Sequence, residues 1–280
     1  MTTIYDPATL GFNPQISTID RCQIALLRSI TAQFGSGRMI LKGGMAMRVS
    51  VGSMRLTKDL DFNRAPSLSL ASLKGGINRL LGNAAMNAGI RQSRVDITKA
   101  STTTLRARLE GISTANAKPM FEVEVSGRSA IDPALVKREL VVPPSSYGLA
   151  PFVVECYSND ALAAQKTLAA MSDSRDVPRD IHDLFDLATL GADPSRILAG
   201  QAPAFLSSLR GKSLGKLEQI GFDRMREELA PYLPVAMREA IDDSRWTEML
   251  IKASESIEAW VAHAIEIAGD DAARPPPRST

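Results

Sequence analysis

The sequence has few of the residues on which several other classes of protein depend. Aromatic residues make up 5% of its 280 residues, and it contains two cysteines and two histidines. Cys22 and Cys156 lie far apart in the chain and do not form the cysteine framework of a secreted domain, so we expect a reducing, cytoplasmic location. His182 and His263 are too few for a histidine-based metal site, and His182 is expected on a helix surface.

Long apolar runs and a strong charge imbalance are also missing. No apolar stretch approaches the roughly 20 residues needed to cross a bilayer, and the start, MTTIYDPATLGF, lacks the regions of a signal peptide. We therefore expect no membrane partner. The formal net charge of +2 does not by itself indicate a nucleic-acid surface, which requires clustered charge. The hydrophobic content of 44% is ordinary for a globular protein.

The spacing of apolar residues predicts an α/β region in the first half of the chain. Helices are expected where apolar residues recur at helical spacing, and strands where they alternate with polar residues. The first helix is expected to begin at a start signal formed by Ser17 and Asp20. We expect an irregular lead-in over 1–16 and a mixed segment over 127–150. Helices are expected over 17–34, 44–51 and 67–89, and strands over 38–42, 60–63, 94–98, 103–112, 119–126 and 152–156.

The chain changes character near residue 157, because only helical segments are expected beyond it. The longest of these covers 244–268. The last residues contain three consecutive prolines and are expected to be disordered. The predicted organisation is a domain over residues 1–157, a helical domain over 158–268 and a tail over 269–280.

One stretch, LKGGMAMRVSVGSMRLTKDLDF, carries the first candidate site. The Gly43-Gly44 turn follows a short strand, and glycine lets the backbone come close to a phosphate. Asp59 and Asp61 are two apart on the next expected strand, so they project to the same face. Paired carboxylates repel unless a cation lies between them, and Mg²⁺ prefers oxygen ligands. The stretch predicts a site that holds phosphates and a divalent metal.

A second strand adds carboxylates to this candidate site. In PMFEVEVS the residues Glu122 and Glu124 fall on one face of the strand, and the apolar residues fall on the other. Nucleotidyl transfer uses two metal ions, and a third carboxylate on a neighbouring strand would share one of them. Glu124 is the first candidate, and Glu122 is its competitor.

The helical region carries a second group of charged residues. The segment ALAAQKTLAAM presents Lys166 among small and apolar residues, where a cation could hold a triphosphate. In RDIHDL, Asp180 and Asp183 are three apart and share one helix face. A further basic set could form an RNA surface beside the carboxylates. It consists of Lys74, Arg79, Arg91, Arg94, Lys99, Arg106 and Arg108.

These patterns resemble a known family. A Gly-Gly turn followed by D-x-D is similar to the opening motif of polymerase-β-type nucleotidyltransferases. The fuller pattern KGG-x-A-x-R, then R-x-T-x-D-x-D-F, and later K and RD-x-x-D-L resembles the AbiEii/AbiGii toxins of type IV toxin–antitoxin and abortive-infection systems. The resemblance implies an α/β (α+β) polymerase-β-like core with a mixed sheet, followed by an all-helical C-terminal domain.

The resemblance also implies roles for individual residues. Two Mg²⁺ ions would be held by Asp59, Asp61 and Glu124, with an NTP as substrate. Thr57 would bind phosphate or a metal-bound water, or serve as a modification switch. The implied nucleotide-binding residues are Lys42, Gly43, Gly44, Arg55, Thr57 and Lys166. The implied catalytic residues are Asp59, Asp61, Glu124, Lys166, Asp180 and Asp183.

The implied function is a growth-arresting toxin. It would transfer a nucleotide from an NTP to an RNA 3′ end, the tRNA acceptor end first of all, and stop translation. Its implied partners are tRNA and a cognate antitoxin, which is a protein that binds the toxin or acts by modifying it. One alternative keeps the enzyme class with a small-molecule acceptor, such as an aminoglycoside, or a protein hydroxyl. A second alternative is a non-catalytic nucleotide- or RNA-binding module, since Glu124, Met45 and Thr57 stand where the family has Asp, Thr and Ser.

Overall fold

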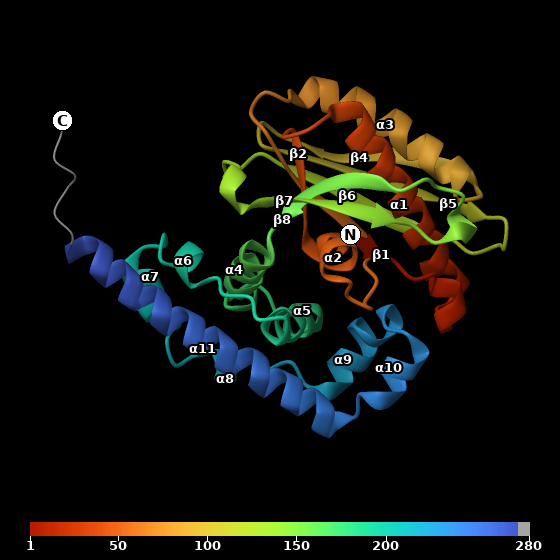
Figure 1. The fold of residues 1–280 in the computed structure, drawn as a ribbon. Helices are drawn as coiled ribbons and strands as arrows, with labels where there is room; N and C mark the ends of the chain where they lie inside the picture. The colour runs from red at the N-terminus through yellow and green to blue at the C-terminus, as the bar shows by residue number, and fades with distance from the viewer. Residues whose placement is uncertain (274–280) are drawn as a thin grey trace. The chain divides into compact units, whose positions relative to one another are not determined.

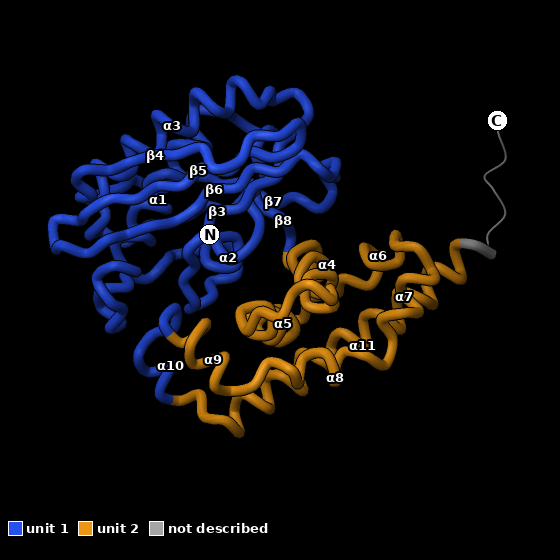
Figure 2. Tube along the Cα trace, turned by 180° about the vertical axis from the view of Figure 1, so that it is seen from behind, with its two compact units in different colours: residues 1–158, 231–239 blue, residues 159–230, 240–280 orange. Residues whose placement is uncertain are grey.

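The computed structural model describes residues 1–273, which divide into two compact units. Unit 1 contains residues 1–158 and 231–239, and unit 2 contains residues 159–230 and those from 240 onward (Figure 2). The segment 231–239 falls in the predicted C-terminal domain but belongs to unit 1. A backbone hydrogen bond of 2.8 Å from the Leu56 amide to the Tyr232 carbonyl ties it there.

Unit 1 is built on a mixed sheet, which confirms the predicted α/β class. The strand order is β1-β7-β8-β2-β3-β6-β5-β4. The pairs β1–β7, β2–β8 and β3–β6 are parallel, and the other neighbouring pairs are antiparallel. The strands are β1 (Thr2–Thr3), β2 (Met39–Lys42), β3 (Asp59–Arg64), β4 (Ile90–Ala100), β5 (Thr104–Ser113), β6 (Met120–Ser126), β7 (Val136–Val142) and β8 (Phe152–Tyr157).

The two faces of the central strands differ because apolar and charged residues alternate along them. On β5 and β6, Leu105, Leu109, Phe121 and Val123 are buried, while the arginines and glutamates between them are half-buried. Helices α1 (Pro14–Phe34) and α3 (Leu70–Asn87) pack against each other and cover the apolar face (Figure 1). The charged face carries the side chains of the candidate site.

Helix α1 begins earlier than expected, and α3 contains two consecutive glycines. Helix α1 begins at Pro14 rather than at Ser17, because the side chain of Asn13 accepts hydrogen bonds from the amides of Gln15 and Ile16. Helix α3 runs through Gly75-Gly76 without a break. Close packing explains the glycine at position 76, because a methyl group there would lie 2.8 Å from Cζ of Phe34 in α1.

Two strands of the sheet lie where no strand is predicted. Strand β1 contains two residues of the predicted irregular lead-in, and β7 lies within the predicted mixed segment 127–150. The sequence of β7, VKRELVV, has charges in succession that obscure its alternation. Its pairing with β8 therefore comes from the tertiary fold. Short helical turns precede and follow it, namely η3 (Pro133–Leu135) and η4 (Ser145–Tyr147), and η1 (Pro7–Leu10) follows β1.

Unit 2 is helical, as predicted. Helix α11 packs against α5, α6, α7, α8 and α9 (Figure 1). Trp246 of α11 is buried and donates a hydrogen bond of 2.9 Å to the carbonyl of Ile220. The helices are α4 (Asn159–Ala170), α5 (Pro178–Thr189), α6 (Ser195–Leu198), α7 (Pro203–Leu209), α8 (Ser213–Leu217), α9 (Phe222–Glu228) and α11 (Asp243–Ala273), with η5 (Ala230–Tyr232) and α10 (Val235–Ala240) between α9 and α11 in the chain.

The C-terminal part of the chain also corrects one expectation. Helix α11 continues to Ala273, so residues 269–273 are helical rather than disordered. The rest of the predicted tail, 274–280, lies outside the described residues. Among residues 1–273, no helix combines the length and apolar character needed to cross a bilayer.

Candidate active site

The Gly43-Gly44 turn joins β2 to α2 (Gly43–Ala46), which continues into the π-helical turn η2 (Met47–Val51). Gly43 has φ +67°, a left-handed conformation that residues with a side chain rarely adopt. A methyl group on Gly43 would also lie 2.6 Å from Oδ2 of Asp61. Glycine is therefore required here for two reasons, the backbone conformation and the close approach of a carboxylate.

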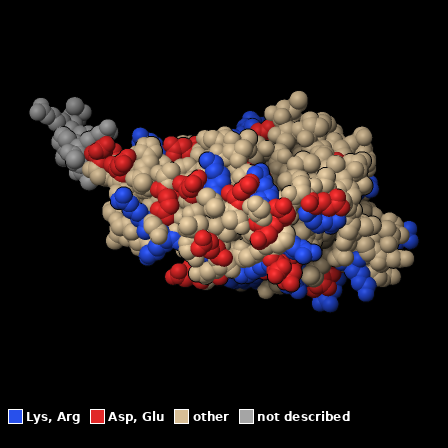
Figure 3. Space-filling view, turned by 90° about the horizontal axis from the view of Figure 1, so that it is seen from below, with Lys and Arg blue, Asp and Glu red and all other residues tan. Residues whose placement is uncertain are grey.

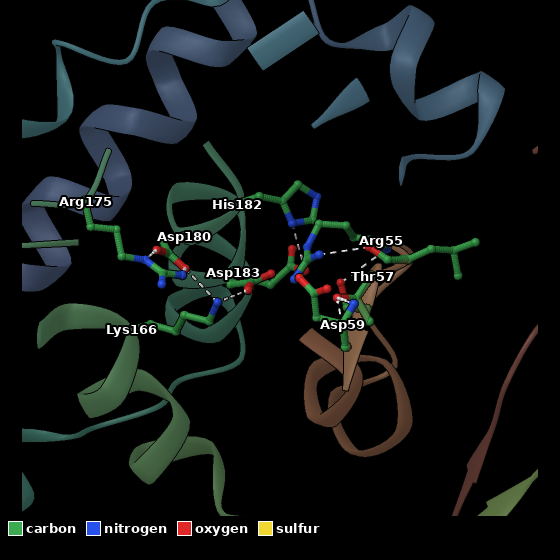
Figure 4. Close-up of polar contacts among 11 residues, drawn as sticks. Arg55, Thr57, Asp59, Lys166, Arg175, Asp180, His182 and Asp183 are labelled. Atoms are coloured by element: carbon green, nitrogen blue, oxygen red, sulfur yellow. Dashed lines mark hydrogen bonds and ion pairs between the residues drawn. The ribbon is translucent and has the colours of Figure 1, made fainter. Parts of the chain in front are cut away.

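Gly44 lies against two other residues of the predicted site. A methyl group on Gly44 would lie 2.8 Å both from Nη2 of Arg55 and from Oγ1 of Thr57. Arg55 also donates a hydrogen bond of 2.8 Å to the carbonyl of Leu56, and Oγ1 of Thr57 lies 3.4 Å from the amide nitrogen of Asp59. Figure 4 shows Arg55, Thr57 and Asp59 close together at the start of β3. The turn and the segment before β3 thus form one packed group.

Asp59 and Asp61 are half-buried on the charged face of β3. Lys42, the last residue of β2, lies directly opposite Asp61 in the antiparallel β2–β3 pair. Directly paired residues project to the same face, so the structure brings this lysine beside the predicted carboxylates. Lys42, Gly43, Asp59 and Asp61 thus lie together within unit 1.

The two candidate glutamates lie on the neighbouring strand. In the parallel β3–β6 pair, Asp59 is in register with Glu122 and Asp61 with Glu124. Each glutamate is held by an arginine of β5. Arg106 Nη2 lies 2.5 Å from Oε2 of Glu124, and Arg108 Nη2 lies 2.8 Å from Oε1 of Glu122. The hydrogen bond with Glu124 raises the pKa of Arg106, so this side chain stays charged.

The donor set of this face fits a divalent cation at the two aspartates. Asp59 and Asp61 supply the carboxylate oxygens that Mg²⁺ prefers. No three Asp, Glu, His or Cys side chains within the described residues converge into a ready-made metal site. The glutamates that could add a third carboxylate are engaged by Arg106 and Arg108. Two candidate ligands therefore lie on one face, and each candidate third carboxylate is held by an arginine.

A buried ion pair joins the segment after the Gly43-Gly44 turn to α1. The sequence-based predictions gave this pair no role. Arg48 of η2 is 1% exposed, and its Nε lies 2.7 Å from Oδ1 of Asp20 in α1. Tyr147 donates a hydrogen bond of 2.5 Å to Oδ2 of Asp20, and the Arg48 guanidinium lies 4.2 Å from the ring centre of Tyr5. Burial, together with the Asp20 carboxylate, raises the pKa of Tyr147. These contacts fasten the segment after Gly44 to α1.

Two signals in the sequence indicate this pair. Arg48 is the last residue of KGGMAMR, so it belongs to the recognised motif. Asp20 lies in a stretch of α1 that is rich in apolar residues, and a charge buried there requires a partner. The expectation that Asp20 forms part of the helix start is wrong, because α1 begins six residues earlier at Pro14.

The remaining predicted residues form an ion-pair cluster inside unit 2. Lys166 Nζ lies 2.7 Å from Oδ1 of Asp180 and 2.6 Å from Oδ2 of Asp183. Arg175 Nε lies 2.6 Å from Oδ2 of Asp180, and Figure 4 shows the cluster between α4 and α5. Burial raises the pKa of Asp180, but Lys166 and Arg175 outweigh it, so the pKa lies below its usual value. Lys166 is thus a buried, paired lysine.

His182 on α5 also differs from expectation. The sequence predicts it on the helix surface, but it is 1% exposed. Its Nδ1 lies 3.5 Å from Oδ2 of Asp186, one helical turn further along. The preceding and following residues, Ile181 and Asp183, are also buried, so the start of α5 is enclosed on more than one side.

The predicted basic RNA surface is not one surface. Arg106 and Arg108 lie on the charged face of the sheet and are paired with glutamates. Lys74 and Arg79 lie on α3, which covers the opposite, apolar face. In the view of Figure 3, basic and acidic side chains are interspersed. The charges therefore indicate no broad cationic area on the face shown there.

Several proteins of known structure share this fold. JHP933 from Helicobacter pylori is similar with a TM-score of 0.60 and 17% identity, over 94% of this chain and 97% of that one. A putative nucleotidyltransferase from H. pylori is similar with a TM-score of 0.58 and 16% identity, over 92% and 98%. MenT4, a nucleotidyltransferase toxin from Mycobacterium tuberculosis H37Rv, has a TM-score of 0.50 and 17% identity, over 91% and 93%.

The sequence comparisons identify the family. None of the curated proteins matches the chain. The family described as nucleotidyl transferase AbiEii toxin, type IV toxin–antitoxin system, matches residues 25–267, which is most of the chain. This range contains the Gly-Gly turn, the carboxylate strands and the Lys166 cluster. The chain therefore belongs to the AbiEii family of nucleotidyltransferase toxins of type IV toxin–antitoxin systems.

Proposed function

We propose that this nucleotidyltransferase transfers a nucleoside monophosphate from an NTP to the 3′ end of an RNA and so blocks translation. The proposed acceptor is the 3′ end of tRNA, and the reaction depends on Mg²⁺. One observation carries the proposal of the site: the Asp61 carboxylate lies against the side-chain-free face of Gly43, with Asp59 on the same face of β3. The backbone that would bind phosphate and the carboxylates that would bind the metal are therefore adjacent.

Asp59 and Asp61 are the proposed metal ligands, with Glu124 as the third carboxylate. Bound there, Mg²⁺ would neutralise the triphosphate and activate the attacking hydroxyl. The glycines leave the backbone of the turn open to phosphate oxygens. Lys42, opposite Asp61, supplies a positive charge on the same face, which favours binding of the negatively charged triphosphate.

Three of the residues for which the family resemblance implies a catalytic role, Lys166, Asp180 and Asp183, lie in unit 2. Lys166 is proposed as the cation that holds the phosphates. Its Nζ contacts both Asp180 and Asp183, so it would have to exchange one carboxylate for a phosphate oxygen. Asp180 and Asp183 are then positioning residues that keep the lysine charged and oriented.

The acceptor and the antitoxin are proposed on the same resemblance. An RNA 3′ end offers a ribose hydroxyl that attacks the α-phosphorus, so that a phosphodiester bond forms and pyrophosphate leaves. A type IV system implies a cognate antitoxin. We propose that it either binds the toxin or modifies it, with the Thr57 hydroxyl as the candidate position.

The test is transfer of label from each α-labelled NTP to total tRNA in the presence of Mg²⁺. Wild-type protein is compared with a variant carrying Asp59→Ala and Asp61→Ala. We expect label on tRNA 3′ ends from one or more NTPs, lost when Mg²⁺ is chelated and lost in the double variant. The nucleotide that labels best identifies the substrate.

A matched control removes a carboxylate from the same sheet face. Asp96 of β4 pairs with Arg94 at 2.8 Å and lies two strands from β6. The Asp96→Ala variant should retain transfer. Absence of label on tRNA, from protein that is folded and binds NTP, would reject the tRNA acceptor. An aminoglycoside or a protein hydroxyl would then replace tRNA as the proposed acceptor.

A further inference from the structure

Charged residues on four neighbouring strands form two rows across the sheet. One row contains Asp61, Glu124, Arg106 and Lys99, and the other contains Asp59, Glu122, Arg108 and Asp96. Neighbouring strands are about 4.8 Å apart, so each arginine lies one strand away from its glutamate and two strands away from an aspartate. Each row thus places an arginine next to the carboxylates that face the proposed metal.

The two arginines hold their glutamates differently. Arg106 contacts Glu124 through one carboxylate oxygen, since Nε and Nη2 both donate to Oε2, at 3.1 and 2.5 Å. Among the described residues, Oε1 of Glu124 accepts no hydrogen bond. Glu122 also accepts both hydrogen bonds of Arg108 on one oxygen, Oε1, but its Oε2 lies 3.7 Å from Nε of Arg106. Arg106 thus contacts both glutamates, and Glu124, in register with Asp61, is held through one oxygen only.

We propose that Arg106 is a positioning residue that holds Glu124 beside Asp61 and competes with the divalent cation for it. This inference rests on the proposed metal site of the preceding section. Arg106 supplies a positive charge directly at the Glu124 carboxylate. When a cation binds to Asp59 and Asp61, Glu124 turns Oε1, and then Oε2, toward it. Arg106 is released at that moment and can meet a phosphate of the substrate.

The physical basis is the balance of charge on this face. Arg106 offsets the negative charge of Glu124, so removal of Arg106 makes this face more negative and more attractive to a divalent cation. The Arg106 side chain is 39% exposed, so water weakens its effect. A unit charge about 5 Å from a divalent ion in a water-like dielectric changes the affinity on the order of tenfold. The wild-type protein is thus expected to bind metal weakly in the absence of nucleotide.

The test measures binding of Mn²⁺ alone to the full chain, by the loss of the free-ion signal in electron paramagnetic resonance. The Arg106→Gln variant keeps a hydrogen-bond donor for Glu124 but removes the charge. We expect it to bind Mn²⁺ about tenfold more tightly than wild type. The Arg106→Lys variant restores the charge and should restore the weaker affinity. Adding Glu124→Gln to Arg106→Gln should abolish the gain.

Arg108 provides the matched control. It lies on the same strand with 40% of its side chain exposed, and it pairs with Glu122 rather than Glu124. The Arg108→Gln variant should change Mn²⁺ affinity clearly less than Arg106→Gln. A larger gain in Arg108→Gln would overturn the inference and make Glu122 the contested ligand. Equal gains in both variants would also overturn it, because general surface charge would then explain them.

The outcomes separate this inference from the proposed function. If wild-type protein transfers nucleotides, but Arg106→Gln binds Mn²⁺ no more tightly, only the role of Arg106 fails. If Asp59→Ala and Asp61→Ala leave Mn²⁺ binding unchanged, the proposed metal site is rejected. The role of Arg106 and the proposed catalytic site then both fail. Folding of each variant is checked by its thermal unfolding without metal, where an exposed pair has little effect.

Discussion

The carboxylate of Asp61 lies against the α-carbon of Gly43, so that a methyl group there would be 2.6 Å from Oδ2. Gly43 directly follows β2 and Asp61 lies within β3, and the antiparallel pairing of these strands brings the two residues together. The same glycine has a left-handed backbone, with φ +67°. The position of the carboxylate and the shape of the turn are thus linked through one residue.

The first prediction concerns this link. Gly43→Ala should reduce nucleotide transfer about 100-fold, because displacing a reacting group by about 1 Å has an effect of that size. It should also destabilise the fold by about 1–2 kcal/mol, the usual penalty for alanine in a left-handed conformation. Initial rates of transfer and the free energy of unfolding in urea measure the two effects.

Gly52 is the control for this substitution. It has φ +75°, but an added methyl group would have no neighbouring atom within 4 Å, so Gly52→Ala creates backbone strain without touching a carboxylate. We expect a similar loss of stability and little loss of transfer. Equal losses of transfer in the two variants would show that strain alone, rather than contact with Asp61, explains the effect.

The second prediction uses two consecutive glycines of α3. Gly75 has no neighbour within 4 Å of an added methyl group, whereas at Gly76 the group would lie 2.8 Å from Cζ of the buried Phe34. Gly75→Ala should stabilise the protein by up to about 1 kcal/mol through helix propensity. Gly76→Ala should destabilise it by about 1–3 kcal/mol through overpacking. Urea unfolding of both variants checks the signs, and the same sign in both would contradict the packing between α1 and α3.

The third prediction compares two lysines of unit 2. Replacing Lys166 with Met removes the cation that contacts both Asp180 and Asp183, whose side chains are 1% and 0% exposed. Removing one partner of a buried ion pair costs about 3–5 kcal/mol. Lys216 pairs with Asp176, which is 32% exposed, so Lys216→Met leaves a hydrated carboxylate and should cost about 1 kcal/mol or less. Thermal unfolding distinguishes them, and a cost for Lys166→Met no larger than for Lys216→Met would reject the buried cluster.

The fourth prediction is the pH dependence of this cluster. Burial raises the pKa of Asp180, but the charges of Lys166 and Arg175 outweigh it and lower the pKa below its unfolded value. A lowered native pKa stabilises the fold above the unfolded pKa of about 3.9 and loses this stabilisation as pH falls through the native value. The difference in unfolding free energy between wild type and Asp180→Asn should therefore be constant near neutrality and shrink below about pH 4. A difference that persists into strong acid would contradict the shift.

Much of the fold follows from local patterns. Alternation of apolar and charged residues identifies β5 and β6 with their correct faces, and the spacing of apolar residues identifies α1 and α3. Strands β1 and β7 are not identified, since one has two residues and the other carries successive charges. Both depend on pairing with strands distant in the sequence, which local patterns do not report.

The candidate site also contains features that local sequence patterns predict and features that they do not. The Gly-Gly turn and the acids of β3 are visible in the sequence, because turn chemistry and a period of two are properties of neighbouring residues. Arg106 and Arg108 are visible too, but only as part of a basic surface. Their partnership with the glutamates depends on the register of β5 against β6.

The sequence by itself therefore determined the family, the fold class and the residue types of the candidate site. Only the tertiary structure decided which charges are paired, namely Glu124 with Arg106, Arg48 with Asp20, and Lys166 with Asp180 and Asp183. The physical reason is that side-chain type and periodicity are encoded locally, whereas the partner of a charge is set by strand register and helix packing between distant segments.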